Sequence, residues 1–134
     1  MKGYCLCRAV SLAVASAPEY VNACNCRLCR SSGAAWGYYQ PEEVTVTGAT
    51  SAFRRDDLGH EPLSEVHFCP RCGSTTHFLV THPEHQGIGV NTRIFDQDDL
   101  EGLDMRYYDS RNFSRDGGEA KLTGTGKISD GRTF

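Results

Sequence analysis

HFCPRCGS, residues 67–74, is the segment from which the fold of this chain can be inferred. It places two cysteines at Cys-x-x-Cys spacing and follows them with Gly73, which is the pattern of a zinc knuckle. The spacing lets two thiolates converge on one metal ion, and glycine permits a backbone conformation in which amide N–H groups point at sulfur. A knuckle supplies only two of the four ligands that structural zinc requires, so two more must come from elsewhere in the chain.

The start of the chain offers those two ligands in GYCLC, residues 3–7. Residues i and i+2 of a strand point to the same face, so the sulfurs of Cys5 and Cys7 can reach one metal ion. With Cys69 and Cys72 they make a complete four-cysteine site, which would hold the first strand against the knuckle. The alternative is that Cys5 and Cys7 are small buried hydrophobic residues.

The three remaining cysteines lie in CNCRLCR, residues 24–30. A strand end that runs into a helical turn can place Cys24, Cys26 and Cys29 around a single ion. Structural zinc usually has four protein ligands, whereas catalytic zinc has three and leaves one position for water or substrate. We therefore expect an open second site. A histidine could close it instead, and the candidates are His60, His67, His77, His82 and His85.

Length and composition favour metal sites over disulfides. The chain has 134 residues, which is the length of a single domain. It contains seven cysteines and has a net charge of -3. Its N-terminus MKGYCLCRAV lacks the apolar core of a secretory signal, and no apolar run approaches the roughly 20 residues of a membrane span. We expect a cytoplasmic, reducing location, where an odd number of cysteines suits metal binding. The low net charge argues against nucleic acid as a partner.

The rest of the chain contains short segments rich in β-branched and aromatic residues, separated by Gly, Pro and Asp. We predict strands at residues 9–14, 36–39, 44–47, 65–68, 76–81 and 88–94. Residues 27–32 and 97–103 could each form a helical turn, and no longer window has a helical period. The sequence therefore predicts a mainly antiparallel, all-β architecture.

The end of the chain has a different composition. FSRDGGEAKLTGTGKISDGRTF, residues 113–134, contains few large apolar residues and much Gly, Ser and Thr. We expect residues 1–112 to form one zinc-binding domain, followed by a tail that is either loose or paired with a sheet edge.

Four motifs carry a resemblance to a known family: GYCLC at 3–7, CNCRLCRSSG at 24–33, FCPRCGS at 68–74 and GVNTRIFD at 89–96. In their order and spacing the chain resembles the glutathione-dependent formaldehyde-activating enzyme (Gfa) family, whose domain is shared with centromere protein V. The resemblance covers approximately residues 1–110. In the first motif the family often has glycine after the second cysteine, where this chain has Arg8.

The resemblance implies an all-β fold of the Mss4-like, or β-tent, type with little helix. It implies two zinc ions per chain: a structural ion on Cys5, Cys7, Cys69 and Cys72, and a second on Cys24, Cys26 and Cys29. It also implies a carbon–sulfur lyase activity, in which glutathione and formaldehyde combine to S-hydroxymethylglutathione.

The chemistry of three thiolates agrees with that activity. Such a zinc ion carries a formal charge of about -1 and is a poor generator of hydroxide, so a soft small-molecule thiol is the more natural fourth ligand. We expect that thiol and a small aldehyde as partners. A zinc-stabilised binding module without catalytic activity is the alternative.

Nearby residues have two interpretations each. Arg27 and Arg30 flank the sulfurs and could hold a carboxylate of the ligand, or they could be solvated surface charges. Trp36, Tyr38 and Tyr39 could wall a substrate pocket, or they could belong to the core.

Overall fold

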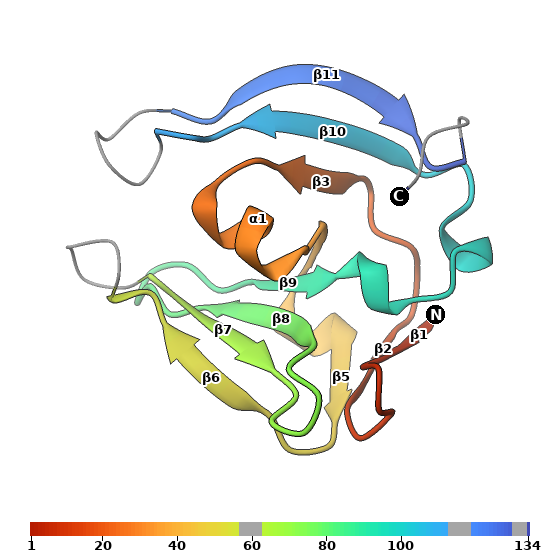
Figure 1. Cartoon of the computed structure of the whole chain (residues 1–134), viewed down its shortest axis with the longest axis vertical. Helices are drawn as coiled ribbons and strands as arrows, with labels where there is room; N and C mark the ends of the chain where they lie inside the picture. Colours follow the sequence, from red (N-terminus) through yellow and green to blue (C-terminus); the bar gives the residue numbers. More distant parts are fainter. Residues whose placement is uncertain (57–62, 113–118, 130–133) are drawn as a thin grey trace.

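The computed structural model describes residues 1–56, 63–112, 119–129 and 134 (Figure 1). Strands are the main secondary structure of the described chain. These are β1 (Lys2–Tyr4), β2 (Ser11–Val14), β3 (Val21–Cys24), β4 (Trp36–Tyr39), β5 (Val44–Thr47), β6 (Ser51–Arg54), β7 (Ser64–Phe68), β8 (Thr75–Val80), β9 (Ile88–Asn91), β10 (Asp104–Asp109) and β11 (Lys121–Lys127). The helical elements with defined bounds in the described residues are α1 (Arg27–Ser32) and the 3-10 turns η1 (Pro41–Glu43), η3 (Thr92–Ile94) and η4 (Asp98–Leu100).

The strands form two sheets. The small sheet has the order β1-β2-β5, and the large sheet has the order β11-β10-β3-β4-β9-β8-β7-β6. The predicted all-β fold with little helix is confirmed. One neighbouring pair departs from the antiparallel pattern, because β3 and β10 run parallel, with Tyr108 opposite Cys24.

The sequence located some elements and missed others. Strands β4 and β5 and helix α1 have the predicted bounds, and β2, β7 and β8 differ from them only at their ends. Residues 88–94 were expected as one strand, but β9 ends at Asn91, whose side chain accepts the backbone N–H of Arg93 at 3.2 Å and caps η3. Asn side chains compete with strand pairing in this way. The turn expected over 97–103 is the shorter η4, and β6 and β10 were not predicted. The strand expected at Cys5 and Cys7 is β1, which ends before them at Tyr4, and the strand end expected at Cys24 is the end of β3.

Residues 121–127 of the tail form β11, which pairs with β10 at the edge of the large sheet. The following residue, Ile128, is buried and donates its backbone N–H to Leu103 O at 2.9 Å. Residues 113–118 and 130–133 of the predicted tail lie outside the described residues.

The two faces of the large sheet have different neighbours. On one face Val21, Tyr39, Val90 and Met105 join the main hydrophobic core, together with residues of the small sheet such as Leu12. Side chains alternate along a strand, so the residues between these lie on the other face. We call that second surface the site face, and it carries Asn22, Cys24, Trp36, Tyr38, Phe78 and Arg106.

Candidate metal centres

Cys5, Cys7, Cys69 and Cys72, here called the knuckle site, lie together in the structure. Their four sulfur atoms are all within 4.8 Å of one another. Cys5 and Cys7 follow β1, while Cys69 and Cys72 lie in the turn between β7 and β8. The Sγ atom of Cys7 is 3.7 Å from that of Cys5 and 3.7 Å from that of Cys69. The predicted approach of the first strand to the knuckle is therefore present.

The knuckle turn has the backbone that its sequence predicts. Gly73 has a φ of 75°, in the left-handed region that favours glycine. Its N–H donates to Cys69 O at 2.9 Å, and the N–H of Cys69 donates to Ser74 O at 2.9 Å. These bonds close the turn and bring the two sulfurs to one side.

The turn around Arg8 keeps a glycine-like backbone despite its side chain. Arg8 has a φ of 63°, and its N–H donates to Cys5 O at 2.9 Å. Its guanidinium lies over the ring of Tyr4, with Cζ 4.3 Å from the ring centroid. The N–H of Val10 then reaches Cys5 Sγ at 3.2 Å. With Arg8 at this position, the turn still brings the sulfurs of Cys5 and Cys7 together, 3.7 Å apart.

Ser74 connects the two halves of the knuckle site. Its hydroxyl lies 3.2 Å from Cys72 Sγ and accepts the backbone N–H of Leu6 at 3.2 Å. The hydrogen bond from this hydroxyl is the main reason that the pKa of Cys72 falls to about 5. A lowered pKa favours the thiolate, which is the form that binds metal.

Cys24, Cys26 and Cys29, here called the three-sulfur site, form the second group. Their sulfur atoms also lie within 4.8 Å of one another, and no described His, Asp or Glu joins them. Cys24 ends β3, Cys26 is the N-cap of α1, and Cys29 lies on the first turn of that helix. The Sγ atoms of Cys26 and Cys29 are 3.4 Å apart. The strand end and the helical turn thus place the sulfurs as the spacing predicts.

Two N–H groups point at sulfurs of the three-sulfur site. The backbone N–H of Cys26 donates to Cys24 Sγ at 3.3 Å, and the indole Nε1–H of Trp36 donates to Cys29 Sγ at 3.2 Å. Trp36 is only 3% exposed, and the ring of Phe78 meets it edge-on at a centroid distance of 4.9 Å. Donors of this kind stabilise negative charge on sulfur.

The three thiols influence one another strongly. Hydrogen bonds from Cys26 and then Cys29 lower the pKa of Cys24, whereas the bonds to Cys24 and Cys26 raise the pKa of Cys29. Without a cation, three neighbouring sulfurs cannot all be thiolates, because like charges repel. A divalent cation removes that restriction. The donor set and the hydrogen bonds therefore fit a thiophilic metal such as zinc.

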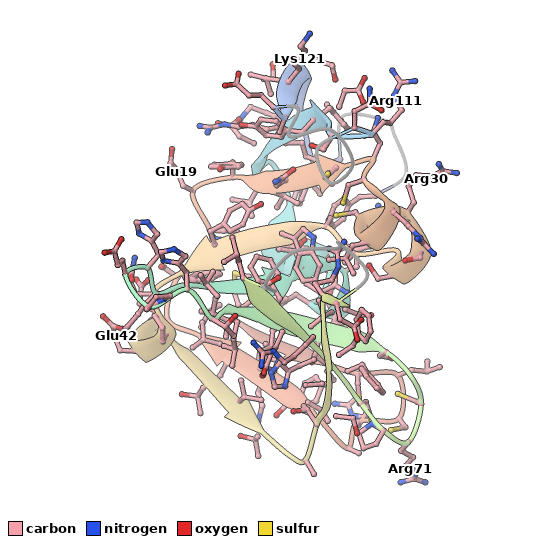
Figure 2. All side chains as sticks on the ribbon, turned by 90° about the vertical axis from the view of Figure 1, so that its left-hand side faces the viewer. Glu19, Arg30, Glu42, Arg71, Arg111 and Lys121 are labelled. Carbon is pink, nitrogen blue, oxygen red and sulfur yellow. The ribbon has the colours of Figure 1, made fainter. Side chains whose placement is uncertain are left out.

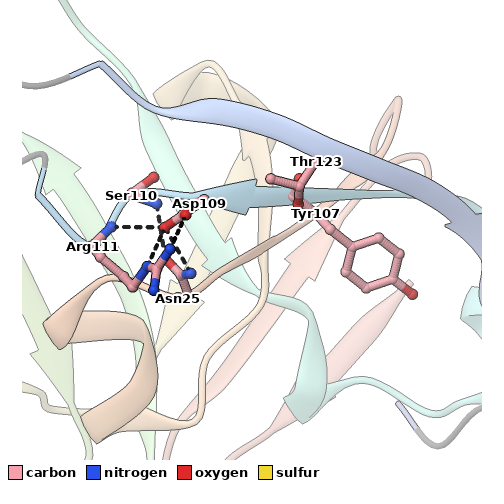
Figure 3. Close-up of polar contacts among 6 residues, drawn as sticks. All are labelled: Asn25, Tyr107, Asp109, Ser110, Arg111 and Thr123. Carbon is pink, nitrogen blue, oxygen red and sulfur yellow. Dashed lines mark hydrogen bonds and ion pairs between the residues drawn. The ribbon is translucent and has the colours of Figure 1, made fainter.

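Asn25 fixes the loop of the three-sulfur site to strand β10 (Figure 3). Its Nδ2 donates to Asp109 Oδ1 at 2.9 Å, and its Oδ1 accepts the backbone N–H of Ser110 at 2.8 Å. Arg111 holds Asp109 from the other side at 2.7 Å, and these hydrogen bonds keep the pKa of Asp109 well below its ordinary value. The parallel pairing of β3 and β10 is what brings these residues together.

The comparisons with known proteins agree with this geometry. The model of the family described as "Glutathione-dependent formaldehyde-activating enzyme" matches residues 1–110. The chain belongs to this family. The family, called Gfa here, takes its name from a formaldehyde-activating enzyme, and its match includes all seven cysteines.

The fold of the chain is similar to that of a solved structure. A crystal structure of a Rhodobacter sphaeroides protein superposes with a TM-score of 0.56 and 25% identity, over 72% of this chain and 88% of that chain. No curated protein matches the chain. Within the described residues, no helix has the length and apolar character needed to cross a membrane.

The histidines proposed as a fourth ligand lie elsewhere. His67, His77, His82 and His85 belong to neither cysteine group, and His60 lies outside the described residues. His67 and His77 face each other across β7 and β8, with their rings stacked at a centroid distance of 4.4 Å. The described histidines therefore leave the three-sulfur site with three ligands.

The arginines and aromatic residues singled out in the sequence separate into different environments. Arg27 and Arg30 are exposed on α1, and Figure 2 shows Arg30 extending away from the body of the molecule. Trp36 contacts the three-sulfur site, whereas Tyr39 points into the main core and donates its hydroxyl to Ser16 O at 3.1 Å. Tyr38 is 42% exposed.

Tyr38 also borders a surface hollow of about 390 Å³. The other residues around this hollow come mostly from the ends of β4, β8 and β9: Tyr39, Gln40, Glu43, Phe78, Val80, Gln86, Gly87 and Ile88.

Sequence reasoning missed Asn22, Asn25, Ser74 and Arg106. Asn22 lies two residues before Cys24, and its Nδ2 donates a short hydrogen bond to the Tyr38 hydroxyl. Its Oδ1 is buried without a hydrogen-bond partner in the described structure. Asn22 could have been noticed from the sequence, because it lies two residues before the ligand Cys24 on the same strand. The contacts of Asn25 depend on strand pairing instead.

Proposed function

We propose that the protein binds two zinc ions and makes or breaks the carbon–sulfur bond of a thiol–aldehyde adduct of the S-hydroxymethylglutathione type. The observation that carries this proposal is the three-sulfur site, where three thiols converge and no fourth His, Cys, Asp or Glu ligand lies among the described residues. Catalytic zinc sites have this composition of three protein ligands and one open position. Membership of the Gfa family supports the same chemistry.

The knuckle site has a different role in this proposal. Its four cysteines would complete the coordination of a structural zinc ion, and they join segments that lie 62 positions apart in the chain. All seven cysteines are free thiols, which agrees with a reducing, cytoplasmic location.

Zinc held by Cys24, Cys26 and Cys29 would lower the pKa of a small thiol in the open position and present it as a thiolate. The sulfur of that thiol would then be able to attack the carbonyl carbon of the aldehyde. A carbon–sulfur bond would form, the C=O π electron pair would move to oxygen, and that oxygen would take up a proton equivalent to the one that the thiol released. The reverse sequence would release the aldehyde and the thiol.

The residues around the sulfurs support this reaction by holding charge and position. The Trp36 indole N–H and the Cys26 backbone N–H donate to sulfur and draw off part of its negative charge. Asn25 holds the loop against β10, so the ligand sulfurs keep their geometry when the fourth position changes occupant.

Cobalt substitution combined with exchange kinetics tests the proposal. Glutathione added to the cobalt protein should shift its visible spectrum, and the zinc protein should accelerate exchange between ¹³C-formaldehyde and its glutathione adduct, followed by NMR. Cys26→Ser is the control, and it should remove both effects. If wild-type protein shows neither effect while retaining two metal ions, the zinc-stabilised binding module is the correct description.

A further inference from the structure

Arg106 is a cation that the fold places on the site face. Strand β10 runs parallel to β3, with Arg106 opposite Asn22 and Tyr108 opposite Cys24. Met105 and Tyr107, on either side of Arg106, contact the main core. Because alternate residues point to opposite faces, Arg106 projects from the same surface as Cys24.

The guanidinium of Arg106 is held by an aromatic ring. Its Cζ lies 3.7 Å from the ring centroid of Tyr20, close enough for a cation–π interaction. Stacking restricts the long side chain, so less conformational entropy is lost when the guanidinium binds an anion.

Aromatic rings continue from Arg106 toward the sulfurs. The Tyr20 ring lies 5.9 Å from the Tyr38 ring, and the Tyr38 ring lies 6.4 Å from that of Phe78. Phe78 in turn packs edge-on against Trp36, whose Nε1–H donates to Cys29 Sγ. The structure thus has sulfur donors at one end of an aromatic row and a cation at the other.

The present partner of the guanidinium is easily displaced. Arg106 Nη2 lies 3.3 Å from Glu19 Oε1, and the side chain of Glu19 is 82% exposed. Such exposed ion pairs are weakened by solvent and salt. Arg106 also has a hydrogen bond with the side chain of Tyr108. The planar guanidinium can donate two parallel hydrogen bonds to a ligand carboxylate in place of the contact with Glu19.

The distance along the sheet limits the size of the ligand. Arg106 lies opposite Asn22, two residues before Cys24, which corresponds to about 7 Å along an extended strand. A single amino acid residue spans about 3.5 Å. A ligand that reaches both Arg106 and the sulfurs is therefore larger than a single amino acid, and its carboxylate lies at least one residue away from the residue that carries the thiol.

We propose that Arg106, stacked on Tyr20, binds the carboxylate of a peptide-sized thiol whose sulfur occupies the three-sulfur site. This inference rests on the proposed function and replaces Arg27 and Arg30 as the residues that select an anionic thiol. Glutathione has the required thiol, length and carboxylates. 2-Mercaptoethanol has the thiol alone.

The test compares these two thiols in the cobalt-substituted protein. Arg106→Gln should weaken glutathione binding by about tenfold, as expected for loss of a charged hydrogen-bond pair, and should change 2-mercaptoethanol binding by less than about twofold. Arg27→Gln and Arg30→Gln are matched controls and should bind both thiols like wild type. Glu19→Gln should tighten glutathione binding by about threefold, because it removes a competing carboxylate of modest strength.

The outcomes separate this inference from the proposed function. Equal glutathione affinity in wild type and Arg106→Gln overturns the role of Arg106 and leaves the proposed function standing. Equal weakening of both thiols also overturns it, because the residue would then act only on the structure. A wild-type spectrum that responds to neither thiol overturns both the role and the function.

Discussion

Asn25 donates a hydrogen bond of 2.9 Å from its Nδ2 to Oδ1 of Asp109, 84 positions later in the chain. Asn25 lies between two of the sulfur ligands, so strand β10 holds the three-sulfur site from outside. Groups of this kind orient the metal ligands. Their loss commonly lowers metal affinity by about 10-fold to 100-fold.

We therefore expect Asn25→Ala to weaken zinc binding at the three-sulfur site by about tenfold or more, while the knuckle site keeps its ion. Chelator competition monitored by metal analysis measures both sites. Asp104→Ala is the control, because Asp104 pairs with Lys127 at 2.7 Å near the other end of β10. The same zinc affinity in Asn25→Ala and wild type would show that β10 does not hold the loop.

Trp36 provides a reporter within the three-sulfur site. It is the only tryptophan, and its indole donates to Cys29 Sγ at 3.2 Å. Cobalt bound at this site should quench tryptophan fluorescence, and Cys29→Ser should abolish the quenching. Arg30→Gln is the control, because Arg30 is exposed and the variant keeps all three sulfurs, so it should retain the quenching. Quenching that survives Cys29→Ser would place the responsive metal elsewhere.

The two metal sites should differ in their effect on folding. A structural zinc ion contributes about 10–16 kcal/mol in zinc-finger peptides, which exceeds or equals the entire stability of an ordinary domain at about 5–15 kcal/mol. We expect Cys72→Ser to give insoluble or unfolded chain, and Cys26→Ser to give folded protein with one zinc ion fewer. Soluble yield, circular dichroism and metal content distinguish them. Equal loss of fold in both variants would contradict the assignment of roles.

His77 should make the fold sensitive to mild acid. Its pKa is lowered to about 4 from an ordinary value of 6.5, chiefly because burial disfavours the charged ring and also because His67 lies against it. Between these two values the unfolded chain binds a proton that the folded chain does not. Stability is therefore lost as pH falls through this window, by about 2 kcal/mol between pH 7 and pH 5.

The His77→Phe variant should lose that part of the acid sensitivity while keeping a ring against His67. Urea unfolding at pH 7 and pH 5, with zinc in excess, measures the difference. His85→Phe is the control, because His85 is exposed in the turn before β9 and should leave the pH dependence unchanged. An identical pH dependence in His77→Phe and wild type would exclude His77 as its source.

The cysteine groups could be predicted because the spacing within each motif is local, and because the need of structural zinc for four ligands joins Cys5 and Cys7 to the distant Cys69 and Cys72. Spacings of one and two residues determine which sulfurs converge, whichever sheet surrounds them. Strands such as β4 were predictable for a similar reason, since aromatic and β-branched residues mark them directly. The left-handed backbone at Arg8 is an exception, because an arginine does not predict a positive φ.

The supporting residues could not be predicted because their information is not local. Arg106 approaches the site face only because β10 pairs with β3 in parallel, and a parallel partner is not marked in either strand's sequence. The sequence left open whether the tail is loose or paired with a sheet edge, because its Gly and Thr residues have a weak strand pattern. In the structure it forms β11 by pairing with β10.

The separation between Asn25 and its partner has a consequence for biosynthesis. A ribosome releases the N-terminal part of a chain first, and the last ligand of the knuckle site is Cys72. The anchor of the three-sulfur site is not made until Asp109 and Ser110 have followed. We expect the nascent chain to complete the knuckle site first, and to bind metal at the three-sulfur site about tenfold more weakly until Asp109 and Ser110 have been made.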